Sequence, residues 1–155
     1  MAKTVEHAFD LLLMRLRGSR SETAAAKRHR ASIEAKLKSQ FGMTAFFRTG
    51  SFGNGTNISG FSDVDYFAVI PANRLKENSA ATLSDIANAL RARFATTDGI
   101  RINGPAVRLP FGLDGAQATE VVPVDELGET KLGYRRFDMP NSKGGWMFAA
   151  PESHN

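Results

Sequence analysis

Two aspartates one residue apart, Asp63 and Asp65, follow a loop that is rich in glycine and serine. Residues i and i+2 of a β-strand lie on the same face, so both carboxylates are expected to point together while Val64 points into the core. Two carboxylates held this close repel each other unless cations lie between them. Mg²⁺ binds one or two carboxylates and completes its coordination with phosphate oxygens and water. The pair therefore predicts magnesium-assisted phosphoryl or nucleotidyl transfer.

The loop ahead of this pair has the residue types of a phosphate-binding turn. Gly50 permits close approach of the backbone to a phosphate, and the Ser51 hydroxyl can donate a hydrogen bond to a phosphate oxygen. The glycines fit neither the P-loop nor the dinucleotide-binding motif. Taken alone, Asn54-Gly55 is a common hairpin turn, and the acidic stretch could be a solvated strand end or a calcium-like loop. Together with the apolar run 67–70 behind the acidic pair, these features favour a transfer site.

These motifs resemble the polymerase-beta-like nucleotidyltransferase superfamily, whose signature is a Gly-Ser turn, a spacer and an Asp-x-Asp pair. Gly55-Thr56 and the Ser-Asp-Val-Asp ending are most similar to the branch of oligoadenylate synthases and bacterial cyclic-oligonucleotide synthases of anti-phage defence. In that family a third carboxylate precedes a Val-Pro on a later strand, and the resemblance assigns it to Glu120 within 118–124. The family usually has aspartate there, so the longer glutamate is a departure. Segments 107–111 and 145–154 also resemble the family.

The resemblance implies the roles of the candidate site residues. The catalytic and metal-binding residues would be Asp63, Asp65 and Glu120, and the nucleotide-binding residues would be Thr49, Gly50 and Ser51. The metal would be Mg²⁺, with Mn²⁺ as a substitute, and the substrates would be nucleoside triphosphates. The product would be a linear or cyclic oligonucleotide second messenger for anti-phage defence. We expect the three carboxyl groups to converge; if Glu120 faced the other side of the sheet, Asp125 or Glu126 would be the next candidate.

The composition limits the number of domains and the class of protein. With 155 residues, 42% hydrophobic and 23% charged, the chain fits one domain over residues 1–155. Without cysteine it has no disulfide framework or thiolate zinc site, and the short apolar run 11–14 predicts neither a signal peptide nor a membrane span, so a cytoplasmic protein is expected. Residues 1–48 carry ten Lys and Arg against four Asp and Glu. This basic part is either a solvated helix surface or a site for a nucleic-acid or protein activator.

The pattern of apolar residues predicts an α/β (α+β) fold. By resemblance this is a mixed β-sheet catalytic core of the polymerase-beta-like nucleotidyltransferase type over 43–155, packed against N-terminal helices within 1–42. Helices are expected at 5–17, at 22–40 (ended by Gly42) and at 82–94 (opened by a Thr82-x-x-Asp85 capping pattern); strands are expected at 44–48, 62–70, 100–111, 117–124 and 134–138, with a hairpin turn at Asp114-Gly115.

Family synthases continue into a helical domain where this chain ends, so a truncated core with weak turnover is expected. An exposed apolar patch near Trp146, Met147 and Phe148 would follow. Two alternatives stay open: a stand-alone minimal nucleotidyltransferase that modifies a protein or RNA, and a non-catalytic module that binds nucleotides or nucleic acid.

Overall fold

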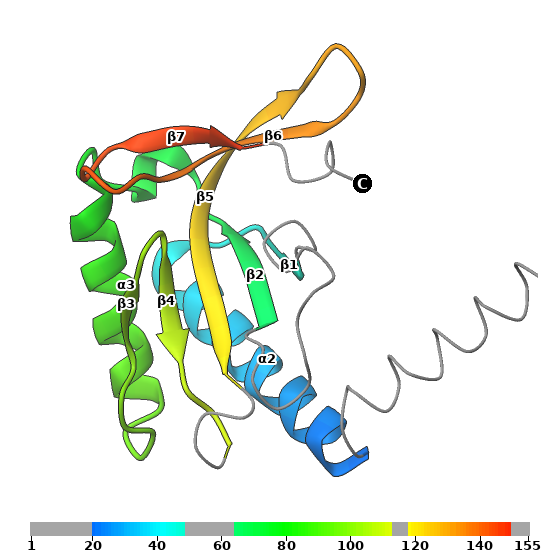
Figure 1. Ribbon diagram of the computed structural model, residues 1–155, viewed down its shortest axis with the longest axis vertical. Helices are drawn as coiled ribbons and strands as arrows, with labels where there is room; N and C mark the ends of the chain where they lie inside the picture. Colours follow the sequence, from blue (N-terminus) through cyan, green and yellow to red (C-terminus); the bar gives the residue numbers. More distant parts are fainter. Residues whose placement is uncertain (1–19, 49–63, 113–117, 150–155) are drawn as a thin grey trace, which may run out of the picture.

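The computed structural model describes residues 20–48, 64–112 and 118–149. Figure 1 shows the elements in chain order: α2 (Arg20–Phe41), β1 (Ala45–Arg48), β2 (Val64–Val69), the 3-10 helix η1 (Ala72–Arg74), α3 (Ser79–Arg93), β3 (Arg101–Asn103), β4 (Ala106–Leu109), β5 (Thr119–Glu129), β6 (Arg135–Pro140) and β7 (Trp146–Ala149). The expected helix at 5–17 and the hairpin turn at 114–115 lie outside the described residues. None of the helices in the described ranges is long and apolar enough to cross a membrane.

The strands form one mixed sheet in the order β1-β2-β5-β4-β3, and β6 and β7 extend it from the second half of β5. Strands β2 and β5 pair in parallel, whereas the other pairings between described strands are antiparallel. A bulge between Glu126 and Gly128 interrupts the β5–β6 ladder, and Gly128 has a φ of 102° there. The mixed sheet with helices confirms the predicted α+β fold class.

Helices α2 and α3 cover one face of the sheet (Figure 1). Ile33 and Leu37 of α2 and Ile86 and Leu90 of α3 are completely buried against that face. Strand residues alternate between faces, so β2 supplies Tyr66 and Ala68 to this main core, with Val64 packed against it, while the residues between them face away. Gly42 ends α2 with a φ of 67°, as the sequence predicted.

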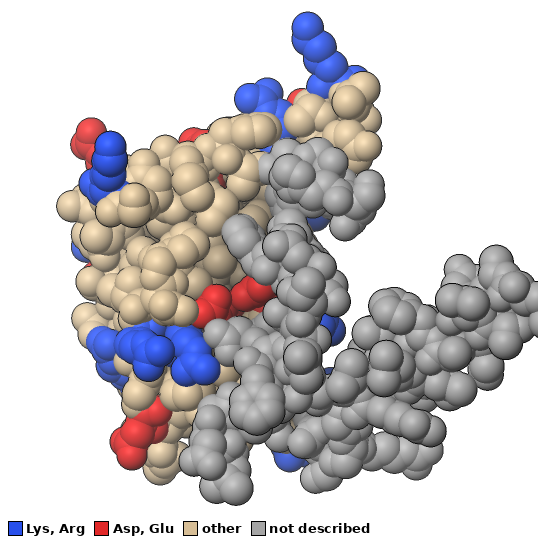
Figure 2. All heavy atoms as spheres, in the orientation of Figure 1, with Lys and Arg blue, Asp and Glu red and all other residues tan. Residues whose placement is uncertain are grey.

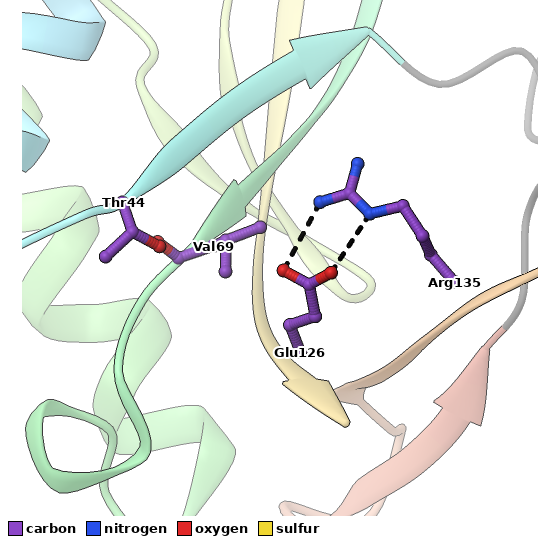
Figure 3. A network of polar contacts seen from close by, with 4 residues as sticks. All are labelled: Thr44, Val69, Glu126 and Arg135. Atoms are coloured by element: carbon purple, nitrogen blue, oxygen red, sulfur yellow. Dashed lines mark hydrogen bonds and ion pairs between the residues drawn. The ribbon is translucent and has the colours of Figure 1, made fainter. Parts of the chain in front are cut away.

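A second, smaller hydrophobic core lies on the face of the sheet that is opposite the helices. Its buried residues are Phe67, Val69, Ala106, Val122, Val124, Phe137 and Met139. Arg135 joins this core to the β5–β6 hairpin: its guanidinium lies 4.5 Å from the ring centroid of Phe47 and 5.1 Å from that of Phe137. The same guanidinium donates to both carboxylate oxygens of Glu126, at 3.0 and 3.3 Å (Figure 3). The second core therefore fixes β6 against the end of β1, next to the residues that precede the Gly-Ser turn.

Two local predictions were wrong. Residues 100–111 contain two strands, β3 and β4, because Gly104-Pro105 makes a tight turn between the paired residues Asn103 and Ala106, with Gly104 at a φ of 59°. Helix α3 begins at Ser79 rather than at Thr82, since the Asn78 side chain accepts a hydrogen bond from the Ala80 amide. The Thr82 hydroxyl instead accepts from the Lys76 amide at 2.9 Å.

The pair Asp125–Asp138 predicts a dependence of stability on pH. These two are Cα partners on β5 and β6, and burial, followed by the charge of Asp138, raises the pKa of Asp125. The folded protein thus holds this proton more tightly than the unfolded chain. Its free energy of unfolding falls as the pH rises from the ordinary value of 3.8 through the raised pKa. Asp125→Asn should raise the stability at pH 7 by about 0.5 kcal/mol.

Thermal unfolding across the acid range tests this. The advantage of Asp125→Asn over the unsubstituted protein should shrink as the pH is lowered toward 3, because the Asp125 carboxyl, whose pKa is raised, is then protonated. Asp98→Asn, at an exposed position before β3, is the control. A less stable Asp125→Asn protein at pH 7 would contradict the prediction.

Candidate active site

Asp65 and Glu120 lie side by side at the centre of the sheet. Asp65 is the second residue of β2, Glu120 is the second residue of β5, and the two are Cα partners in the parallel pairing of these strands. Both carboxylates project from the face opposite the helices, because Phe67 and Val122, two residues further along each strand, belong to the second core. The structure therefore brings together two acidic residues that are far apart in the sequence.

Burial differs between these two carboxylates. Asp65 is only 8% exposed, whereas Glu120 is half-buried. The positions follow from the local sequence: in each strand an acidic residue precedes an apolar run, so the acidic end stays outside the second core while the rest of that face is covered. Glu120 at this edge of the core is thus partly open to solvent, and the buried Asp65 lies directly beside it.

Sequence reasoning missed the polar neighbours of Glu120. The Asn103 amide on β3 donates a hydrogen bond of 2.6 Å to one carboxylate oxygen, Oε1 of Glu120. Arg108 on β4 is the Cα partner of Glu120 on β5. The signal for both was the Gly104-Pro105 dipeptide, a turn indicator at which the chain folds β3 back beside β4.

The remaining predicted site residues are not placed by the structure. Asp63, Thr49, Gly50 and Ser51 lie outside the described residues. Within the described ranges there is no group of three or more His, Cys, Asp or Glu side chains suited to hold a metal ion. The described donor set is thus the pair Asp65 and Glu120. Two hard carboxylate ligands fit Mg²⁺, which commonly takes one or two carboxylates and fills its other positions with substrate phosphates and water.

Asp125 and Glu126, the fallback candidates, occupy other positions. Asp125 faces Asp138 and Glu126 is paired with Arg135, both at the β5–β6 ladder and further along β5 than the acidic pair. Since Glu120 lies on the same face as Asp65, neither is needed for the third carboxylate.

Strand β7 carries the apolar side chains that the sequence predicted to be exposed. Met147 is 45% exposed and Phe148 is 56% exposed. Trp146, by contrast, is half-buried and its indole N–H lies 3.1 Å from the backbone oxygens of Lys76 and Glu77. Trp146 therefore anchors β7 to the segment that leads into α3, while its two neighbours face outward.

Several solved structures resemble this fold. The CdnE cyclic dinucleotide synthase of Elizabethkingia meningoseptica, determined with GTP and Apcpp, superposes with a TM-score of 0.59 at 21% identity, covering 83% of this chain and 49% of that one. CdnC of E. coli MS115-1, with ATP, gives 0.58 at 21% identity over 86% and 42% of the two chains. The CD-NTase CdnG of Bradyrhizobium diazoefficiens, with GTP, gives 0.62 at 14% identity over 85% and 40%. The chain thus spans less than half the length of each of these proteins.

These likenesses confirm the nucleotidyltransferase-type fold. A search of curated proteins found no match. The family comparison is more direct, because residues 3–155, nearly the whole chain, match the model of one protein family. The chain belongs to the family of the Second Messenger Oligonucleotide or Dinucleotide Synthetase domain, SMODS.

Proposed function

We propose that this chain is the catalytic core of a metal-dependent nucleotidyltransferase that joins nucleoside triphosphates into a linear or cyclic oligonucleotide second messenger, acting in the cytoplasm in anti-phage defence. The observation that carries the proposal is the adjacent pair Asp65–Glu120, in a chain of the SMODS family. The GTP, ATP and Apcpp in the similar structures support nucleoside triphosphates as substrates.

The metal would be Mg²⁺, held by Asp63, Asp65 and Glu120. When bound, it would supply charge neutralisation for the triphosphate and a lowered pKa for the acceptor hydroxyl. Asp65, which is central and buried, would help to hold metal both at the acceptor hydroxyl and at the donor triphosphate. Glu120 would help to hold metal at the acceptor hydroxyl only. The hydrogen bond from Asn103 to Oε1 would hold the longer glutamate side chain in one orientation.

The reaction is an in-line displacement at the α-phosphorus of one nucleoside triphosphate. A hydroxyl oxygen of the acceptor forms a new bond to this phosphorus, its proton leaves to solvent, and the bond to the bridging oxygen breaks to release pyrophosphate. Thr49, Gly50 and Ser51 would orient the β- and γ-phosphates of the donor. The contribution of the protein is then mainly the positioning of two nucleotides and the binding of the metal.

Incubation with labelled nucleoside triphosphates and Mg²⁺ or Mn²⁺, followed by chromatography, tests the function. Oligonucleotides and pyrophosphate are the expected products, formed slowly by this chain and faster by a longer form of the protein if further residues complete the cleft. Glu120→Gln should abolish them. Glu129→Gln, an exposed position at the far end of the same strand, should not.

Other outcomes would overturn the proposal. Label transferred to a protein or to RNA would identify a minimal nucleotidyltransferase of another kind. Nucleotide binding without any transfer in either form would identify a binding module. Stimulation of product formation by added nucleic acid or protein would instead be consistent with the proposal and would indicate an activator that binds the basic N-terminal segment.

A further inference from the structure

One hydrogen bond connects the edge of the described sheet to its acidic centre. Asn103 is the last residue of β3, the outermost described strand on this side, and its amide Nδ2 donates to Oε1 of Glu120 on β5 at 2.6 Å. Strand β4 lies between β3 and β5, so the bond passes over β4. It lies on the face that carries the acidic pair, and Figure 2 shows acidic atoms at the centre of this face.

The span of this contact is long. Asn103 is the Cα partner of Ala106 on β4. Glu120 is the partner of Arg108, two residues further along the same strand. With strands about 4.8 Å apart and residues about 3.4 Å apart along a strand, the Cα atoms of Asn103 and Glu120 are about 12 Å apart in a flat sheet. The hydrogen bond therefore needs the length of both side chains, and an aspartate at position 120, one methylene shorter, would not reach Asn103.

A small residue on β4 leaves the path of this bond open. Ala106 is the cross-strand partner of Asn103, so the two side chains lie on the same face of the sheet. Its single methyl group belongs to the second core and is 1% exposed. A larger side chain at this position would occupy the space that the Asn103 and Glu120 side chains cross.

The bond is better suited to orient a side chain than to stabilise the fold. It is short and has a carboxylate acceptor, as in charge-assisted hydrogen bonds. Asn103 is exposed, however, and an exposed contact on an outer strand contributes little to the free energy of unfolding. Glutamate loses considerable rotamer freedom when it is held in one orientation, so a fixed donor lowers the entropic cost of using it as a ligand.

We propose that Asn103 and Glu120 act as one coupled metal-binding unit, in which Asn103 is a positioning residue and the length of the glutamate is matched to a donor on the far side of β4. This inference rests on the proposed function for the role of Glu120 as a metal ligand. Partners of ligating groups commonly account for 10- to 100-fold in metal affinity. Asn103 itself would touch neither the metal nor the nucleotides.

A double-mutant cycle with Mn²⁺ alone tests the coupling. Electron paramagnetic resonance would measure the affinity of the full chain for Mn²⁺, without nucleotide. Asn103→Ala should weaken binding at least tenfold. Glu120→Asp should also weaken it, and adding Asn103→Ala to Glu120→Asp should have no further effect, because the shorter side chain already lacks the hydrogen bond. The rate of pyrophosphate release should follow the same pattern.

A matched control is available on α3. Asn88 is exposed, and its side chain accepts a hydrogen bond of 3.1 Å from Arg91, on the face of the sheet that the helices cover. Asn88→Ala should leave the Mn²⁺ affinity unchanged. Asn103→Ala should melt within about 2 °C of the unsubstituted chain, since it removes only an exposed contact. This separates positioning from a structural role.

Two results would overturn the coupling: unchanged Mn²⁺ affinity in Asn103→Ala, or an equal loss from Asn103→Ala with and without Glu120→Asp. Failure of the proposed function is a separate result. In that case the chain with Mg²⁺ makes no oligonucleotide, yet Mn²⁺ binding still depends on Asn103 when Glu120 is present and not in Glu120→Asp.

Discussion

Asp65→Asn is expected to lower the rate of nucleotidyl transfer about a thousandfold without loss of the fold. The reason is that metal binding contributes several kcal/mol to stabilising the transition state, and each 1.4 kcal/mol is a factor of ten in rate. Asparagine keeps the size of the side chain but removes its charge. In metal-free buffer the variant should melt at the same temperature or slightly higher, because one of two neighbouring carboxylates, Asp65 beside Glu120, has been neutralised.

Two measurements check this expectation together. Release of labelled pyrophosphate reports transfer, and Mn²⁺ binding followed by electron paramagnetic resonance reports the metal site directly, even where turnover is slow. Asp85→Asn, a change on α3 that affects an exposed ion pair with Lys76, is the matched control and should retain both. A large drop in melting temperature for Asp65→Asn would show instead that the carboxylate has a structural role.

Phe137→Ala is expected to destabilise the protein by about 3–5 kcal/mol, the usual cost of removing a buried phenylalanine. Phe137 on β6 is completely buried, its ring packs edge-on against Phe67 at 5.2 Å, and it lies 5.7 Å from the ring of Phe47. The substitution leaves a cavity where β6 meets the central sheet, and it removes one ring that contacts the Arg135 guanidinium. Urea or guanidinium unfolding, with the midpoint and slope compared, would measure the loss.

A control substitution for Phe137→Ala is available at the tip of the β5–β6 hairpin. Leu132 at its tip is 83% exposed, so Leu132→Ala should change the free energy of unfolding by less than about 0.5 kcal/mol. If Phe137→Ala cost less than about 1 kcal/mol, the second core would not be what holds β6 to the sheet.

Long periodic segments were predictable from the sequence. The helix expected at 22–40 is α2, the strands at 44–48 and 62–70 contain β1 and β2, and the strand at 117–124 is the first half of β5. Each combines an apolar pattern with a clear boundary, such as Gly42 after α2. The neighbouring positions of Asp65 and Glu120 agree with the expectation that these carboxylates converge, while the roles given to them stay predictions.

The wrong predictions were made where a local turn or a helix cap overrode the apolar pattern of the sequence. Residues 100–111 were predicted as one strand, but the Gly104-Pro105 turn divides them, and this turn places Asn103 where it donates a hydrogen bond to Glu120. Similarly, Asn78 caps α3 ahead of the Thr82 pattern because its side chain reaches the Ala80 amide. Strand β7 was not predicted, because segment 145–154 was identified only by its resemblance to the family; the structure shows that Trp146–Ala149 folds back on β6 as a hairpin, with Trp146 opposite Pro140.

The acidic pair cannot form before β5 joins the sheet, because β5 carries Glu120 and is the last of the central strands in the sequence. This strand lies between β2 and β4, both of which precede it in the sequence, so these two strands are joined in the sheet only through β5. Parallel, non-local pairings form late because their closure entropy is paid before their contacts are gained. A nascent chain that has emerged only through Leu109 carries Asp65 without Glu120. If the proposed function holds, synthesis of an oligonucleotide messenger then requires that β5, the last central strand in the sequence, has paired with its neighbours.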